Sequence, residues 1–130
     1  IVKVTAGIMT QNRKIFIAQR AKPASLNKLW EFPGGKVERG ETPETSLLRE
    51  LGEEFSIHVS VNEFVGSTVY HYPDISIELL AYKVLWLDGT IQLKEHLSYS
   101  WVLVDALDQY RFAPADIPIV KKIRSGEIEV

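Results

Sequence analysis

The chain has 130 residues, a length typical of one domain with its own hydrophobic core, so we expect a single domain over residues 1–130. Its formal net charge of −2 provides no basic surface for sequence-independent binding to nucleic acid, and no such partner is expected. The absence of cysteine excludes disulfides and thiolate catalysis. No apolar run has the length of a membrane span and no signal-peptide pattern opens the chain, so we expect a cytoplasmic protein without a membrane partner. Nothing in the sequence indicates an oligomeric state.

Two strands are predicted at the start, over residues 2–9 and 14–19, around a turn at 10–13. Arg20 ends the second strand, where an arginine either clamps an anion such as phosphate or lies on the surface. The aromatic side chains of residues 29–33 are expected to pack under the double glycine that follows. Lys36, directly after the glycines, is a candidate phosphate contact, with a solvated lysine as the alternative.

A helix is predicted to begin at Pro43, with Thr42 as its N-cap, and to end near residue 55. Positions three and four apart share a helix face, so three carboxylates are expected to project together, opposite a buried stripe. The carboxylates are Glu50, Glu53 and Glu54, and the stripe is Leu47, Leu48, Leu51 and Phe55. Like charges at this spacing repel unless a cation lies among them, and oxygen ligands suit Mg²⁺, with Mn²⁺ as a possible substitute. The pattern predicts a metal site for phosphate chemistry, although a Glu-rich helix is more often only a solvated face.

The spacing around this helix resembles the signature of the Nudix hydrolases. Gly35 is followed after five residues by Glu41, and after seven more by Arg49-Glu50-Leu51, one residue, and Glu53-Glu54. Ser56 departs from the signature, which usually has glycine there to supply a left-handed turn. We expect a local change of geometry at Ser56 rather than a loss of activity.

Strands are predicted after the helix over residues 57–61, 64–71, 76–87 and 99–104, with a bulge at Gly66. Turns are predicted at 72–75 and at 87–90, the second from its Asp-Gly pair, and residues 91–93 could continue the sheet. A helical turn over 105–110 and a last helix reaching about residue 125 complete the chain. This order indicates an α+β domain, and the resemblance implies the Nudix fold, a mixed β-sheet sandwiched between α-helices.

Two further residues are assigned by resemblance to MutT-type members of the family. Glu95 lies in a polar loop before a strand with tryptophan, where those enzymes carry a functional glutamate; the alternative is a surface residue. Asp116 occupies the position of a base-recognising residue, and the alternative is a helix N-cap. An aspartate there accepts protons from the cytosine amino group or from the guanine pairing edge, so the base is left open.

The resemblance implies a metal-dependent hydrolysis that gives a nucleoside monophosphate and pyrophosphate. The implied metal ligands are Glu50, Glu53 and Glu54 with the Gly35 carbonyl, and Glu95 as an additional ligand. The general base is Glu53, Glu54 or Glu95, and Arg49 orients the ligating carboxylates through a bidentate pair.

The implied substrate is a damaged nucleotide such as 8-oxo-dGTP, and the alternative is CTP, dCTP or 5-methyl-dCTP. Pro73 lies near the position that marks ADP-ribose hydrolases, but a turn there favours proline anyway. A hydrolase of RNA 5′ ends would be expected to carry a track of basic residues that binds the RNA, and the sequence shows no such track. The non-enzymatic alternative is a nucleotide-binding sensor without turnover.

Overall fold

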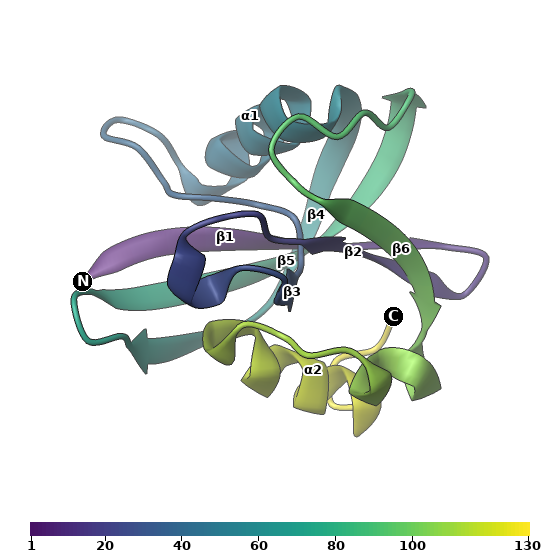
Figure 1. Ribbon diagram of the computed structural model, residues 1–130. Helices are drawn as coiled ribbons and strands as arrows, with labels where there is room; N and C mark the ends of the chain where they lie inside the picture. The colour runs from purple at the N-terminus through teal and green to yellow at the C-terminus, as the bar shows by residue number, and fades with distance from the viewer.

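The computed structural model describes residues 1–130 and consists of one mixed sheet with a helix on each face (Figure 1). The strands are β1 (Val2–Gln11), β2 (Lys14–Gln19), β3 (Trp30–Glu31), β4 (Ile57–His71), β5 (Ser76–Gly89) and β6 (Ser98–Leu103). The helices are α1 (Pro43–Phe55) and α2 (Ile117–Arg124), with short 3₁₀ turns η1 (Ala24–Leu26), η2 (Val104–Gln109) and η3 (Pro114–Asp116). The predicted fold class is therefore confirmed. No helix is long and apolar enough to cross a membrane.

The sheet has the strand order β3-β2-β1-β5-β4, and β6 pairs with β2 outside this order. β1 and β5 run parallel, whereas the other pairings are antiparallel. The β1–β2 turn narrows to Asn12 and Arg13, both with positive φ, as a two-residue hairpin with right-handed strand twist requires.

The strands alternate their side chains between two hydrophobic cores, one beneath each helix. In β1 and β2, Ile8 and Ile17 face the α2 side, while Met9 and Phe16 face the α1 side. Gly7 lies under α1, where a Cβ would contact Leu47 at 3.5 Å and the Pro33 carbonyl at 3.4 Å. The absence of a side chain at Gly7 lets α1 and the loop before it approach the sheet closely.

The N-terminal end of α1 forms as predicted from the sequence. The Thr42 side chain accepts a hydrogen bond from Thr45 N at 3.1 Å, and Pro43 opens the helix. The expected change of geometry at Ser56 was wrong: Ser56 ends the helix in the left-handed region, with φ 58° and ψ 36°, which is the conformation that glycine would supply. The prediction for Leu48 was wrong: its side chain is 44% exposed, because it lies one step around the helix from the stripe of Leu47, Leu51 and Phe55.

Several boundaries after α1 differ from the prediction. β4 is one strand over Ile57–His71, and the register shifts around Phe64 and Gly66 confirm the bulge. β5 continues through Gly89, so the predicted turn at 87–90 was wrong; the Asp-Gly pair ends a strand instead of turning a hairpin, and Gly89 pairs with Ile57. Residues 91–93 form a loop rather than a strand.

The predicted helical turn and last helix form at the end of the chain, as η2 and α2, but the role of Asp116 differs. Asp116 lies at the N-cap position of α2, yet its side chain makes no capping hydrogen bond. Instead, its Oδ1 accepts a hydrogen bond at 3.1 Å from the backbone N–H of Phe32, the residue that directly follows β3. Asp116 therefore holds the double-glycine segment to the α2 side of the molecule.

Candidate active site

The loop that carries Gly34 and Gly35 is hydrogen-bonded to β1. Thr5 N and Thr5 Oγ1 donate to the Gly35 carbonyl at 2.8 and 3.2 Å, and Gly7 N donates to the Pro33 carbonyl at 2.7 Å. A Cβ on Gly34 would overlap the Thr5 carbonyl, and a Cβ on Gly35 would overlap the Glu50 carboxyl group. Both glycines are required because backbone and carboxylate approach each other here without room for a side chain.

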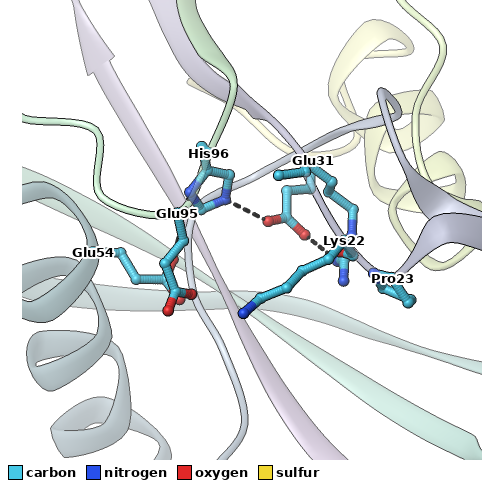
Figure 2. A pocket seen from close by; sticks show the side chains of 8 residues that line it. Lys22, Pro23, Glu31, Glu54, Glu95 and His96 are labelled. Atoms are coloured by element: carbon cyan, nitrogen blue, oxygen red, sulfur yellow. Dashed lines mark hydrogen bonds and ion pairs between the residues drawn. The ribbon is translucent and has the colours of Figure 1, made fainter.

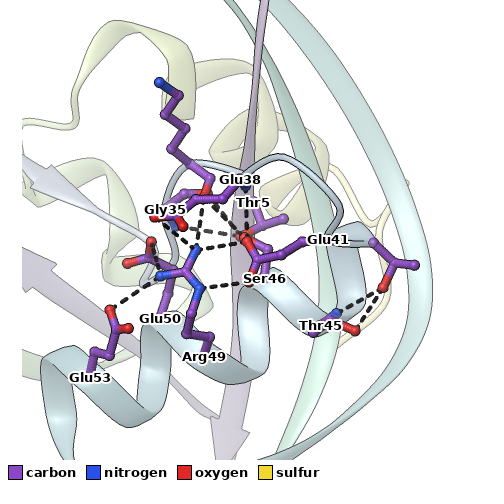
Figure 3. Close-up of polar contacts among 11 residues, drawn as sticks. Thr5, Gly35, Glu38, Glu41, Thr45, Ser46, Arg49, Glu50 and Glu53 are labelled. Carbon is purple, nitrogen blue, oxygen red and sulfur yellow. Dashed lines mark hydrogen bonds and ion pairs between the residues drawn. The ribbon is translucent and has the colours of Figure 1, made fainter.

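Arg49 joins the loop to α1 (Figure 3). Its guanidinium makes a bidentate pair with Glu41, with Nε–Oε2 at 2.6 Å and Nη2–Oε1 at 2.9 Å. Nη2 also donates to the Lys36 carbonyl at 3.2 Å, and Nη1 donates to Glu50 at 3.1 Å and Glu53 at 3.2 Å. This pairing lowers the pKa of Glu41 to about 2 and raises that of Arg49. The bidentate partner is thus Glu41, and each candidate ligand receives a single bond.

The structure separates the three carboxylates of α1. The Glu53 side chain is 61% exposed and contacts Arg49, whereas Glu50 and Glu54 are 13% and 17% exposed. Burial, together with Glu50, Glu31 and Glu95 nearby, raises the pKa of Glu54 to about 9. One oxygen of Glu54, Oε2, is buried without a hydrogen-bond partner. Glu54 therefore lies among other carboxylates, and its Oε2 receives no hydrogen bond from a protein donor.

A pocket of about 380 Å³, a size suited to a small molecule, opens beside Glu54 (Figure 2). It is lined by Arg20, Ala21, Lys22, Pro23, Glu31, Glu54, Glu95 and His96. The Glu54 and Glu95 side chains extend into it from α1 and from the loop before β6, and Lys22 extends toward both. The pocket thus combines carboxylates with lysine and arginine, the charges that a metal–polyphosphate complex requires.

Three charged or polar residues of this pocket, Lys22, Glu31 and His96, were not identified from the sequence. Glu31, on β3, pairs with Arg20 at 2.5 Å through Oε1 and with His96 Nε2 at 2.8 Å through Oε2. Glu31 had only aromatic neighbours as a signal, and His96 belongs to a scattered set of three histidines. Glu31 and His96 are 65 residues apart in the sequence, so no local pattern could predict that they contact each other.

The remaining predicted site residues lie around the pocket at different depths. Arg20 lines it but is engaged by Glu31, and Lys36 is exposed with no ion pair. Asp116 is buried, and burial with the nearby charge of Glu31 raises its pKa well above the ordinary value. The structure therefore brings Arg20, Glu54 and Glu95 to one pocket. The other predicted site residues lie outside its lining: Gly35, Lys36, Arg49, Glu50, Glu53 and Asp116.

The donor set fits a hard divalent cation, although the side chains do not form a closed cage. The unpartnered Glu54 oxygen and the raised pKa of Glu54 both indicate missing positive charge. No three acidic or histidine side chains converge on one point. The Gly35 carbonyl accepts two hydrogen bonds from Thr5, so its use as a ligand would require one of them to be given up.

Comparison with known proteins assigns the chain to a family. The family profile described as NUDIX domain matches residues 4–122. The chain therefore belongs to the Nudix hydrolase family, as the motif around Glu50 indicated, and it is similar to solved structures titled MutT at 38% and 33% identity.

Among its relatives, the CTP pyrophosphohydrolase of Escherichia coli K12 is 40% identical, covering 93% of this chain and 90% of the relative. The 8-oxo-dGTP diphosphatase of the same organism is 35% identical, with 95% and 96% covered. The solution structure of the E. coli ORF135 protein has a TM-score of 0.85 and 38% identity, covering 97% of this chain and 90% of that one.

Proposed function

We propose that the protein is a Mg²⁺-dependent nucleoside triphosphate pyrophosphohydrolase that releases a nucleoside monophosphate and pyrophosphate. The observation that carries the proposal is the unpartnered Glu54 oxygen, buried among carboxylates at the edge of a pocket that also contains Arg20 and Lys22. A divalent cation would pair with the Glu54 oxygen, and the lysine and arginine of the pocket would offset charge on a polyphosphate.

The proposed ligands are Glu50 and Glu54, with Glu95 from the facing loop and with Glu53 and Gly35 at the margin. Bound there, Mg²⁺ would neutralise charge on the phosphates, the principal need of phosphoryl transfer. Arg49 holds Glu50 against Gly35, and Lys22 is placed to contact a phosphate. Glu54 and Glu95 line the pocket and are the side chains best placed to accept the proton of the attacking water.

For the base, we propose 8-oxo-dGTP first. Several relatives bear the name 8-oxo-dGTP diphosphatase, among them the E. coli protein that aligns over 124 residues. Asp116 is the proposed reader of the base, because it is held by Phe32 N at the end of β3 and shares the electrostatic environment of Glu31 and Arg20.

A cytosine nucleotide (CTP, dCTP or 5-methyl-dCTP) is the second candidate, and a specific observation favours it. Burial raises the pKa of Asp116, so its carboxyl group holds a proton more readily than an exposed aspartate. A protonated carboxyl both donates and accepts, which matches the amino group and the ring nitrogen on the pairing edge of cytosine. The relative that is 40% identical bears the name CTP pyrophosphohydrolase.

The test is a pyrophosphate-release assay on the purified chain, with and without Mg²⁺, across 8-oxo-dGTP, dGTP, CTP, dCTP and 5-methyl-dCTP. We expect release only with Mg²⁺ or Mn²⁺, and the highest kcat/KM for 8-oxo-dGTP or, for the second candidate, for a cytosine nucleotide. Nucleotide binding without release would identify a sensor domain and contradict the proposed enzyme.

A further inference from the structure

A second cavity lies against α2, on the face of the sheet opposite α1 (Figure 1). It is formed between η2 and α2, and Leu29 contributes to it from the loop before β3; we refer to it as the α2 groove. Its volume is about 790 Å³, within the range of small-molecule sites and larger than the volume of about 380 Å³ beside Glu54. No residue lines both cavities, so the α2 groove is a separate site.

The surface of the α2 groove is mainly aliphatic. Pro114 and Val120 line it, and Ile117 lines it while remaining 39% exposed. Its uncharged polar side chains are only Tyr110 and Ser125. A nucleobase requires several hydrogen-bonding groups along its edge, so this lining suits an aliphatic chain better than a second nucleotide.

Positive charge borders this aliphatic surface. Arg111, Lys121 and Arg124 line the groove and are exposed, whereas its single carboxylate, Asp108, pairs with Arg124 at 3.5 Å. Arg111 and Lys121 form no ion pair in the folded chain. The groove therefore carries two uncompensated cations, although the chain as a whole has a net charge of −2.

Helix α2 alone does not explain this charge. Cations in the last turn of a helix stabilise it by interacting with its dipole, which accounts for Lys121 and Arg124. Arg111 lies outside α2, in a segment that is hydrogen-bonded to β3: Trp30 N donates to the Arg111 carbonyl at 2.8 Å, and Ala113 N donates to the Trp30 carbonyl at 2.8 Å. Separate segments of the chain thus place cations at one aliphatic cavity, and this charge is complementary to an anionic occupant.

We propose that the α2 groove binds a fatty carboxylate, an aliphatic chain that ends in a negatively charged carboxyl group. The chain would lie against Ile117 and Val120, where burial of methylene groups favours binding, and the carboxylate would contact Arg111 and Lys121. The proposal goes beyond nucleotide hydrolysis and does not depend on it, because none of these residues lines the pocket beside Glu54.

The test titrates the full chain with octanoate and follows its backbone amide shifts by NMR, with octanol as the uncharged analogue of the same chain length. We expect saturable shifts in residues of the α2 groove, and an affinity for octanol roughly 3–10-fold lower, because exposed ion pairs contribute modestly. Arg111→Gln and Lys121→Gln should each lower octanoate affinity about 2–5-fold and leave octanol affinity unchanged. Ile117→Ser should lower the affinity for both by about fivefold, since it removes apolar contact area.

Arg39→Gln is the matched control, because Arg39 is an exposed arginine without an ion pair in the loop before α1, across the sheet from the groove. This variant should bind octanoate like wild type. Equal affinities for octanoate and octanol in wild type would overturn the anionic ligand. A titration without saturable shifts, or with shifts confined to the exposed leucines of β5, Leu85 and Leu87, would overturn the site.

The charge variants decide the inference even if Ile117→Ser fails to fold. Arg111 and Lys121 have exposed side chains without ion pairs, so their substitution should leave the dispersed amide spectrum of the folded chain intact. An octanoate affinity that stays at the wild-type value in both charge variants would show that neither cation contacts the carboxylate, and the proposal would be wrong.

Discussion

Glu54 lies on the face of α1 that carries the candidate metal ligands, and its side chain is only 17% exposed. The helical spacing placed it among the ligand candidates, and burial raises its pKa to about 9, so without a cation it holds a proton at neutral pH. A divalent ion nearby favours the ionised form and reverses this state. If Glu54 is the proposed metal ligand, its substitution should lower activity strongly and change the stability of the metal-free fold little.

We expect Glu54→Gln to lower kcat at least about a hundredfold, the usual effect of losing acid–base or charge stabilisation. The amide has the shape of the protonated acid, so the thermal midpoint measured in EDTA should stay within about 2 °C of wild type. Glu53→Gln is the companion variant, and a comparable loss of turnover is expected if that exposed carboxylate also serves the site. Wild-type turnover in both variants, with folding intact, would contradict the assignment of these carboxylates.

Asp116 gives a residue-scale prediction for pH. Its pKa is raised in the folded chain, so folding favours the protonated form, and stability is lost as pH rises from about 4, the unfolded value, through the folded pKa. Asp116→Asn removes the ionisation while the amide oxygen can still accept from Phe32 N. We therefore expect the stability of the variant relative to wild type to be higher at pH 8 than at pH 4.

Urea unfolding at both pH values measures this difference. A stability difference that does not change with pH would show that the Asp116 carboxyl ionises as readily in the folded chain as in the unfolded one. The same variant tests recognition of the base: an unchanged base preference would count against Asp116 as the reader.

At the scale of elements, α1 is the part that local sequence determines most completely. Thr42, Pro43 and the apolar spacing specify its start and its buried face, and each acts within four residues. The exception is its end. Ser56 adopts the left-handed conformation that glycine takes without steric cost, so the geometry expected of glycine is reached with a residue that is strained there.

We expect Ser56→Gly to raise the free energy of unfolding by about 0.5–1 kcal/mol, because relief of the left-handed strain exceeds the added flexibility of the unfolded chain. Ser125 ends α2 with φ −78°, so Ser125→Gly is a matched control in which no strain is relieved and no gain is expected. Chemical denaturation of both variants decides the point. A loss of stability in Ser56→Gly would mean that Ser56 contributes interactions larger than its strain.

The strands after α1 show where local patterns cease to suffice. The Asp88-Gly89 pair has the composition of a hairpin turn, yet β5 continues through it because Ile57 and His58 of β4 pair with it. The parallel pairing of β1 with β5 joins residues about 75 positions apart, from Val2 with Ile77 to Met9 with Val84. Tertiary pairing of this kind overrides the propensity of a short segment.

Local sequence patterns are also insufficient to predict the site, because it is assembled from segments across the whole molecule. Arg49, Glu50 and Glu54 follow from one motif, but Glu31 and His96 reach the pocket from β3 and from the loop before β6. Closing the sheet around two cores brings these distant segments together, and it leaves an excess of buried negative charge at their junction. The carboxylates at this junction carry a local electrostatic penalty, which a cation bound there as proposed would relieve.

The last prediction follows from this penalty and concerns the stability of the entire chain. A ligand that binds only the folded state stabilises it by RT ln(1 + [L]/Kd), about 2.7 kcal/mol at one hundred times Kd. For a chain of this size, roughly 3–5 °C per kcal/mol converts this into a rise of about 10 °C in the thermal midpoint when Mg²⁺ is saturating. Glu54→Gln, which leaves the fold intact but removes the ionised oxygen, should lose most of this rise, and EDTA should abolish it in wild type. An equal response to Mg²⁺ in wild type and Glu54→Gln would place the cation elsewhere on the molecule, because the relief of buried charge at Glu54 could then not be its cause.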